Sequence, residues 1–141
     1  MKAALAEGRA VAIADLRGFG ETGRSRHDAN GKRPGDEEIA RCLMALGDSL
    51  VARRAEDLML AAREVAKALG APPLLRAEGR AVIPAAHARF LEPQLFAGAE
   101  TAREPPSWAA LVADETRTGG FADLVRGALC VYDWTDLMDA E

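Results

Sequence analysis

The chain has 141 residues, which is enough for one domain around a single hydrophobic core. Its net charge of −4 and its dispersed basic residues disfavour nucleic-acid binding, which needs a basic face. No apolar run approaches the ~20 residues of a membrane span, and Glu7 and Arg9 interrupt the N-terminal segment before a signal-peptide core can form. We therefore expect one cytoplasmic domain over residues 1–141, with no nucleic-acid or membrane partner.

The first part of the sequence predicts a helix end, a strand and a loop. Residues 2–7 are typical of a short helix that Gly8 ends. Residues 11–14 form a continuous apolar run ending at Asp15, which is typical of a strand buried on both faces of a parallel sheet. Residues 16–35 are polar and rich in glycine, so we expect a long loop there.

Two helices are predicted over the middle of the chain. Asp36 is placed to cap the first, whose first turn holds two glutamates, and Gly47 interrupts it. The second begins near Asp48 or Ser49, carries apolar side chains at steps of three and four, and ends at Gly70.

Short strands alternate with helices in the second half of the chain. A strand over residues 73–77 leads through Gly79 into a helix over about residues 80–91. A weaker strand follows over residues 97–102.

The chain closes with two predicted helices. Ser107 is placed to cap the first, and residues 121–134 carry the apolar spacing of the second. The order of elements predicts an α/β fold with three layers, α/β/α, in which helices cover both faces of a small parallel sheet of about three strands.

The sequence offers no metal or cofactor site. Cys42 and Cys130 lie in apolar, helical contexts and are predicted to be buried free thiols, because neither has a second cysteine or a histidine at ligand spacing. The glycines of residues 18–23 lack the Lys-Ser/Thr ending of a phosphate-binding loop. We expect neither a metal nor a cofactor.

Several segments carry a resemblance to a known family. Residues 11–22 contain Asp-Leu-Arg-Gly-Phe-Gly-Glu-Thr after the apolar run, and the other segments are residues 46–58, residues 80–96, Ser107-Trp108 and residues 127–137. In this order they resemble the acetylxylan-esterase-like branch of the α/β-hydrolases, from its fourth strand through the helices that flank the nucleophile turn to later segments. The resemblance implies a core of α/β-hydrolase type whose parent activity is carboxylic ester hydrolysis.

The resemblance also implies that the serine triad is not intact. In the α/β-hydrolases the strand-to-helix turn carries the nucleophile as Gly-x-Ser-x-Gly, and this chain has Gly79 at the centre of that frame. The family's catalytic acid and histidine follow the segment matching residues 127–137, and the chain ends at Glu141. Because loss of one triad member typically costs ~10⁴-fold or more, we expect a truncated core without serine-esterase activity.

An incomplete sheet is a further implication of the resemblance. In the family, the strands matching residues 11–15 and 73–77 are separated by a strand from an N-terminal part that this chain lacks. The gap would leave backbone groups unpaired, unless the two strands pair directly or another chain fills the opening. We expect a homodimer formed by strand or helix exchange.

Charged residues at the predicted strand ends are the candidate binding residues. Ligands of doubly wound sheets bind beyond the carboxyl ends of the strands, where Asp15, Arg17, Glu78, Gly79 and Arg80 lie. With Arg17, Gly79 and Arg80 as binding residues near a helix N-terminus, such a pocket suits a small ester or an anion. The alternative is that Asp15–Arg17 and Glu78–Arg80 are local ion pairs.

Two functions fit these features. One is a hydrolase-derived module that no longer catalyses and serves as a folding or interaction unit. The other is a small active esterase with a rebuilt or inter-subunit site, in which Glu78, Asp15 or His87 activates water. His87 lies about two turns after Gly79, where a structural role is the alternative, and His27 lies in the predicted long loop.

Overall fold

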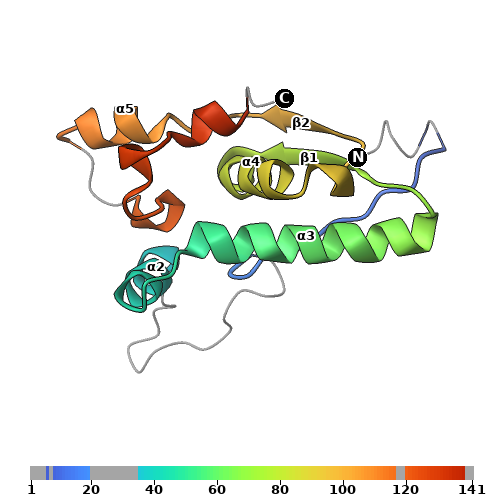
Figure 1. Cartoon of the computed structure of the whole chain (residues 1–141), viewed down its shortest axis with the longest axis horizontal. Helices are drawn as coiled ribbons and strands as arrows, with labels where there is room; N and C mark the ends of the chain where they lie inside the picture. Colours follow the sequence, from blue (N-terminus) through green and yellow to red (C-terminus); the bar gives the residue numbers. More distant parts are fainter. Residues whose placement is uncertain (1–5, 7, 20–34, 117–119, 139–141) are drawn as a thin grey trace.

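The computed structural model describes residues 6, 8–19, 35–116 and 120–138 (Figure 1). Its helices and strands are α2 (Asp36–Ala45), α3 (Leu50–Leu69), β1 (Leu74–Glu78), α4 (Val82–Leu91), β2 (Gly98–Ala102) and α5 (Trp108–Ala113). Short 3₁₀ turns connect or follow them, and these are η2 (Gly79–Ala81), η3 (Pro93–Leu95), η4 (Phe121–Asp123), η5 (Ala128–Cys130) and η6 (Trp134–Leu137). The fold is mixed α/β, as expected. His27 and most of the predicted N-terminal helix end and long loop lie outside the described residues.

Helices α2 and α3 occupy the predicted positions. The Ser49 hydroxyl accepts a hydrogen bond from Ala52 N at 3.0 Å and so caps α3, and Gly70 ends that helix with a φ of +72°. In α2, Asp36 is the first helical residue rather than the cap, which is Gly35. The acidic residues of the first turn still lie at the positive end of the helix dipole.

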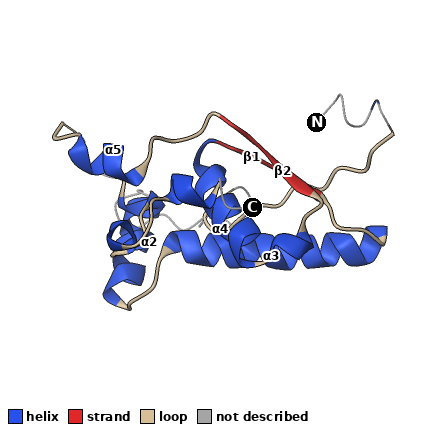
Figure 2. Ribbon diagram, turned by 45° about the horizontal axis from the view of Figure 1, so that its top comes forward, coloured by secondary structure: helices blue, strands red, loops and turns tan. Residues whose placement is uncertain are grey.

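Strands β1 and β2 pair in parallel, with α4 in the crossover between them (Figure 2). Leu75 and Ala77 of β1 pack against the core, whereas Arg76 and Glu78 on the opposite face are exposed. Figures 1 and 2 show α4 beside the strands with α3 beyond it. Because the side chains of Arg76 and Glu78 are exposed, a helical layer on this face of the sheet, and with it the predicted three-layer arrangement, is not confirmed within the described residues.

Residues 11–14 differ most from the sequence prediction. They form no strand and are exposed rather than buried, with 39% of Val11 and 76% of Ile13 accessible to solvent. The described sheet therefore has two strands, not about three. A strand needs a neighbour to satisfy its backbone N–H and C=O groups, and among the described residues β1 pairs only with β2.

The helix predicted over residues 121–134 is also wrong. The structure has the three separate turns η4, η5 and η6 in this region. Gly127, with a φ of +78°, interrupts the right-handed conformation between the first two turns, and Asp133 caps the third. Apolar side chains of this segment nevertheless pack against the core, so their spacing in the sequence resembles a helical stripe.

Two tryptophans organise the core. Trp108 at the start of α5 and Trp134 at the start of η6 are each 1% exposed. Their ring N–H groups donate to the carbonyl oxygens of Asp123 at 2.7 Å and Pro106 at 3.1 Å, so neither buried donor is unpaired. The Asp133 carboxylate joins them, because it accepts from the backbone N–H groups of both tryptophans at 2.9 and 2.7 Å. Helix α5 and turn η6 thus begin at one carboxylate.

The two cysteines are free thiols, as predicted, but both are exposed rather than buried. Cys42 lies on the exposed side of α2, and Cys130 is the last residue of η5. The apolar residues near Cys42 in the sequence suggested burial, but they lie on the opposite side of α2. Those near Cys130 belong to a turn and not to a helix.

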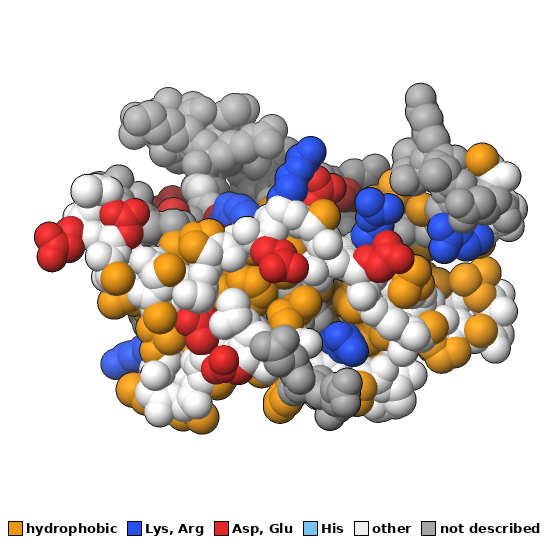
Figure 3. All heavy atoms as spheres, turned by 90° about the horizontal axis from the view of Figure 1, so that it is seen from above, with side chains coloured by type: hydrophobic (Ala, Val, Ile, Leu, Met, Phe, Trp, Pro, Cys, Tyr) orange, Lys and Arg blue, Asp and Glu red, His pale blue; other side chains and the backbone are white. Residues whose placement is uncertain are grey.

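The described surface carries no continuous basic face in the view of Figure 3, where acidic and basic side chains alternate with hydrophobic ones. Among the described residues, no helix has the length and apolar character needed to span a membrane.

Candidate functional site

The turn after β1 has the strand-to-helix geometry that the sequence predicts. β1 ends at Glu78, Gly79 follows with a φ of +59°, and η2 leads directly into α4. A Cβ atom at position 79 would meet no atom within 4 Å. The turn therefore has open space at the position where the resembling family carries its nucleophile, and glycine places no side chain in it.

The charged residues that flank Gly79 pair with distant parts of the chain. Arg103 Nη1 lies 2.8 Å from Glu78 Oε1. Arg80 lies 3.0 Å from Oδ2 of Asp123 through its Nε, and 3.0 Å from Oδ2 of Asp36 through its Nη1. The local Glu78–Arg80 pair considered from the sequence is therefore replaced by long-range pairs.

Asp36 connects Arg80 to a second guanidinium. Arg54 of α3 is only 1% exposed, and its Nη2 donates to Oδ2 of Asp36 at 2.8 Å. The same oxygen lies 3.0 Å from Arg80 Nη1, and Arg80 continues to Asp123. We call Arg54, Asp36, Arg80 and Asp123 the arginine–aspartate network. It joins α3, α2, the glycine turn and η4.

The network also holds the N-terminal segment against α3. Arg54 Nε donates to the carbonyl oxygen of Arg17 at 3.1 Å, and its guanidinium lies 4.0 Å from the ring centroid of Phe19. Gly18, between them, has a φ of +86°, and a Cβ there would lie 3.0 Å from Oδ1 of Asp36 and 3.1 Å from Arg54 Nη2. A side chain at this position would crowd both groups and would be strained at this φ, so the approach favours glycine.

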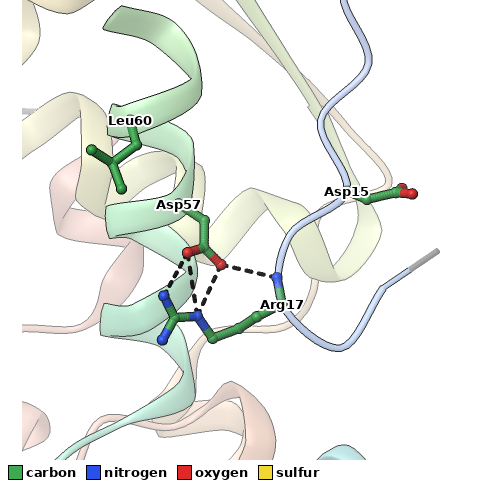
Figure 4. Close-up of a pocket in the computed structure, with 4 residues that line it drawn as sticks. All are labelled: Asp15, Arg17, Asp57 and Leu60. Atoms are coloured by element: carbon green, nitrogen blue, oxygen red, sulfur yellow. Dashed lines mark hydrogen bonds and ion pairs between the residues drawn. The ribbon is translucent and has the colours of Figure 1, made fainter. Parts of the chain in front are cut away.

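An open hollow of about 600 Å³ lies beside this segment, lined by Asp15, Arg17, Asp57 and Leu60 (Figure 4). Arg17 binds Asp57 through Nη2 at 2.6 Å, through Nε at 3.0 Å and through its backbone N–H at 2.9 Å. Figure 4 shows the Asp15 side chain pointing away from this pair, so the carboxylate that neutralises Arg17 is Asp57 rather than Asp15. Burial raises the pKa of Asp57, but the hydrogen bonds and charge of Arg17 outweigh it and hold that pKa below its ordinary value.

His87 lies among aromatic rings. Its ring centroid is 5.8 Å from those of Trp108 and Tyr132. Its Nδ1 lies 2.8 Å from the carbonyl oxygen of Ile83, and its Nε2 lies 2.9 Å from the hydroxyl of Tyr132. Because a carbonyl only accepts, the proton is on Nδ1, and neutral Nε2 accepts from the tyrosine. Burial lowers the pKa of His87, an effect only partly offset by the Ile83 carbonyl, and burial raises the pKa of Tyr132.

No catalytic triad forms among the described residues. Ser49 and Ser107 both cap helices, accepting from backbone N–H groups at 3.0 and 3.1 Å. Both ring nitrogens of His87 are used in structural hydrogen bonds. The candidate residues at the glycine turn lie together only because they are consecutive, and the described residues hold no cluster of histidine, cysteine or carboxylate that could bind a metal ion.

Asp57, Arg54 and Asp123 are the central charged residues that sequence reasoning missed. One signal was available for Arg54, which lies three residues after Val51 and four before Leu58, on the apolar stripe of α3. A charged residue at such a position is buried only when it is paired. No comparable signal identified the aspartates as its distant partners.

No family model matches the chain, and neither does any curated protein or solved structure.

Replacing Asp36 with asparagine is expected to lower the free energy of unfolding by about 3 kcal/mol, because it leaves the buried Arg54 guanidinium without its carboxylate. Urea unfolding monitored by circular dichroism measures the change. The matched control is Glu64→Gln, which removes the exposed Glu64–Lys67 pair of α3 and should leave stability unchanged. Equal effects of the two substitutions would contradict the role given to the network.

Acidification is expected to destabilise the fold through His87, whose folded pKa lies below its ordinary value of 6.5. Between these two values the unfolded chain binds a proton that the folded chain does not. The contribution of neutral His87 to the free energy of unfolding is therefore fully present above about pH 6.5, and it is lost as the pH falls toward the folded pKa. Urea unfolding across this range should show the loss in the wild type and not in His87→Gln. The same pH dependence in the wild type and in His87→Gln would contradict the assignment of this stability loss to His87.

Proposed function

We propose that the chain is an α/β-hydrolase-derived domain that no longer hydrolyses esters through a serine triad and acts as a folding or interaction module. The observation that carries the proposal is Gly79, which lies at the strand-to-helix turn with a positive φ and open space above its Cα atom. The turn has the backbone shape that presents a nucleophile but no side chain that can attack a carbonyl.

The state of His87 supports the same proposal. A general base needs a free lone pair within reach of the proton that it removes. The lone pair of His87 Nε2 accepts from Tyr132, and the Nδ1 proton is donated to a carbonyl oxygen. His87 therefore serves the packing of α4 against the aromatic cluster rather than proton transfer.

The two candidate guanidiniums are also engaged. Arg17 forms a bidentate pair with Asp57, and Arg80 lies between Asp36 and Asp123. An anion or ester carbonyl at either arginine would compete with a carboxylate of the chain itself. This neutralisation favours a structural role for both residues over ligand binding.

Hydrolysis of p-nitrophenyl acetate and p-nitrophenyl butyrate tests the proposal, and no turnover above buffer is expected. Gly79→Ser should fold, lose about 1 kcal/mol of stability because a side chain is strained at positive φ, and stay inactive for want of a base. The matched control is Gly47→Ser, since Gly47 also has a positive φ and open space. Wild-type turnover that disappears in Glu78→Ala or His87→Ala would overturn the proposal in favour of a rebuilt active site.

We further propose that the module forms a homodimer. Within the described residues the sheet has two strands, so β1 and β2 each have one edge without a strand partner. Open edges and exposed apolar segments favour pairing with another chain. Sedimentation at tens of micromolar should show a dimer, and a compact monomer would contradict this part of the proposal.

A further inference from the structure

The segment that the sequence predicted as a buried strand is the most unusual surface of the described chain. Residues 10–14 are Ala-Val-Ala-Ile-Ala, all exposed, and Ile13 is 76% accessible to solvent. No hydrogen bond joins these residues to the rest of the chain that the structure describes. Five consecutive apolar residues with unpaired backbone groups form a strong site for pairing with another strand.

Side-chain order makes this segment complementary to itself. In an extended conformation Val11 and Ile13 lie on one face, and the three alanines lie on the other. Antiparallel pairing of two copies centred on Ala12 places Val11 opposite the partner's Ile13, and it places Ile13 opposite the partner's Val11. Four β-branched side chains then cover one another on one face, which is the kind of cross-strand contact that stabilises a sheet.

The charges that flank the segment select this register. Arg9 precedes it and Asp15 follows it, three residues on either side of Ala12. Antiparallel pairing centred on Ala12 places Arg9 opposite the partner's Asp15 at both ends. Parallel pairing would instead place Arg9 opposite the partner's Arg9 and Asp15 opposite the partner's Asp15, which is unfavourable.

We infer that residues 9–15 of two copies pair as antiparallel strands about a two-fold axis through Ala12, and that this pairing is the interface of the proposed homodimer, on which the inference rests. A two-fold interface uses the same patch on both copies, as this self-complementary sequence requires. Leu60, which is 57% exposed, lines the same hollow as Asp15 and extends the apolar contact onto α3 (Figure 4). Since the contact is small, the dimer dissociates on dilution.

The first test breaks the apolar pairs. Ile13→Asp should convert the dimer to a monomer in sedimentation at tens of micromolar, because it places a carboxylate in each of the two Val11–Ile13 pairs. The matched control is Leu46→Asp, since Leu46 is 80% exposed at the C-cap of α2 and lies outside the segment. Leu46→Asp should leave the dimer intact.

The second test locates the two-fold axis. Facing Cα atoms of an antiparallel pair lie about 4.5–5.5 Å apart, which is within the range that a disulfide bridges. In a background with Cys42→Ser and Cys130→Ser, Ala12→Cys should form an inter-subunit disulfide under mild oxidation. Leu46→Cys in the same background should not.

The third test addresses the register through charge. Arg9→Asp alone and Asp15→Arg alone should each raise the dissociation constant, because each places like charges opposite one another. The double exchange should restore it toward the wild-type value, since opposite charges face each other again. Failure of the double exchange to restore the dimer would overturn the register.

The outcomes separate the two proposals. A wild-type monomer at tens of micromolar would overturn both the homodimer and its interface. A dimer that survives Ile13→Asp and gives no cross-link at position 12 would overturn the interface while leaving the homodimer standing. A dimer that is lost in Ile13→Asp, kept in Leu46→Asp and cross-linked through position 12 would establish the pairing.

Discussion

The burial of one guanidinium is the constraint on which most of this structure depends. Removing Arg54 from water costs several kcal/mol, so its donors need partners in the folded chain. Asp36 supplies a carboxylate, the backbone of Arg17 supplies a carbonyl oxygen, and Phe19 supplies an aromatic face. These three partners come from two segments, so satisfying Arg54 positions α2 and the N-terminal segment against α3.

Arg80 extends this constraint to the candidate site. It shares Asp36 with Arg54, and it follows Gly79 directly, so the network fixes the start of the glycine turn. The turn carries glycine at its centre, and the imidazole of His87 on α4 is held by hydrogen bonds to the Ile83 carbonyl and the Tyr132 hydroxyl. A strand-to-helix turn of this shape does not by itself establish an activity, because function depends on the groups at the site and not on the fold.

Local signals in the sequence were sufficient to predict the elements that begin or end at a capping residue or at a glycine with positive φ. Ser49 and Gly70 delimit α3, and Gly79 marks the strand-to-helix turn, because capping and positive φ depend on the residue itself and its immediate neighbours. The strand predicted over residues 11–14 was wrong and the third layer was not confirmed, because burial depends on what covers a segment. The alternation in β1, where Arg76 and Glu78 point outward, already indicated a sheet with one exposed face.

The sequence by itself determined the positions of α2, α3 and the β1–α4 turn, that this turn carries glycine, and that residues 10–14 form a continuous apolar run. Only the tertiary structure decided which charges meet. Arg17 pairs with Asp57 across 40 positions and Arg80 with Asp123 across 43, rather than with the neighbours at two positions that the sequence suggested. The reason is that packing of distant elements brings Asp57 and Asp123 within hydrogen-bonding distance of these guanidiniums, and spacing along the sequence does not reveal such contacts.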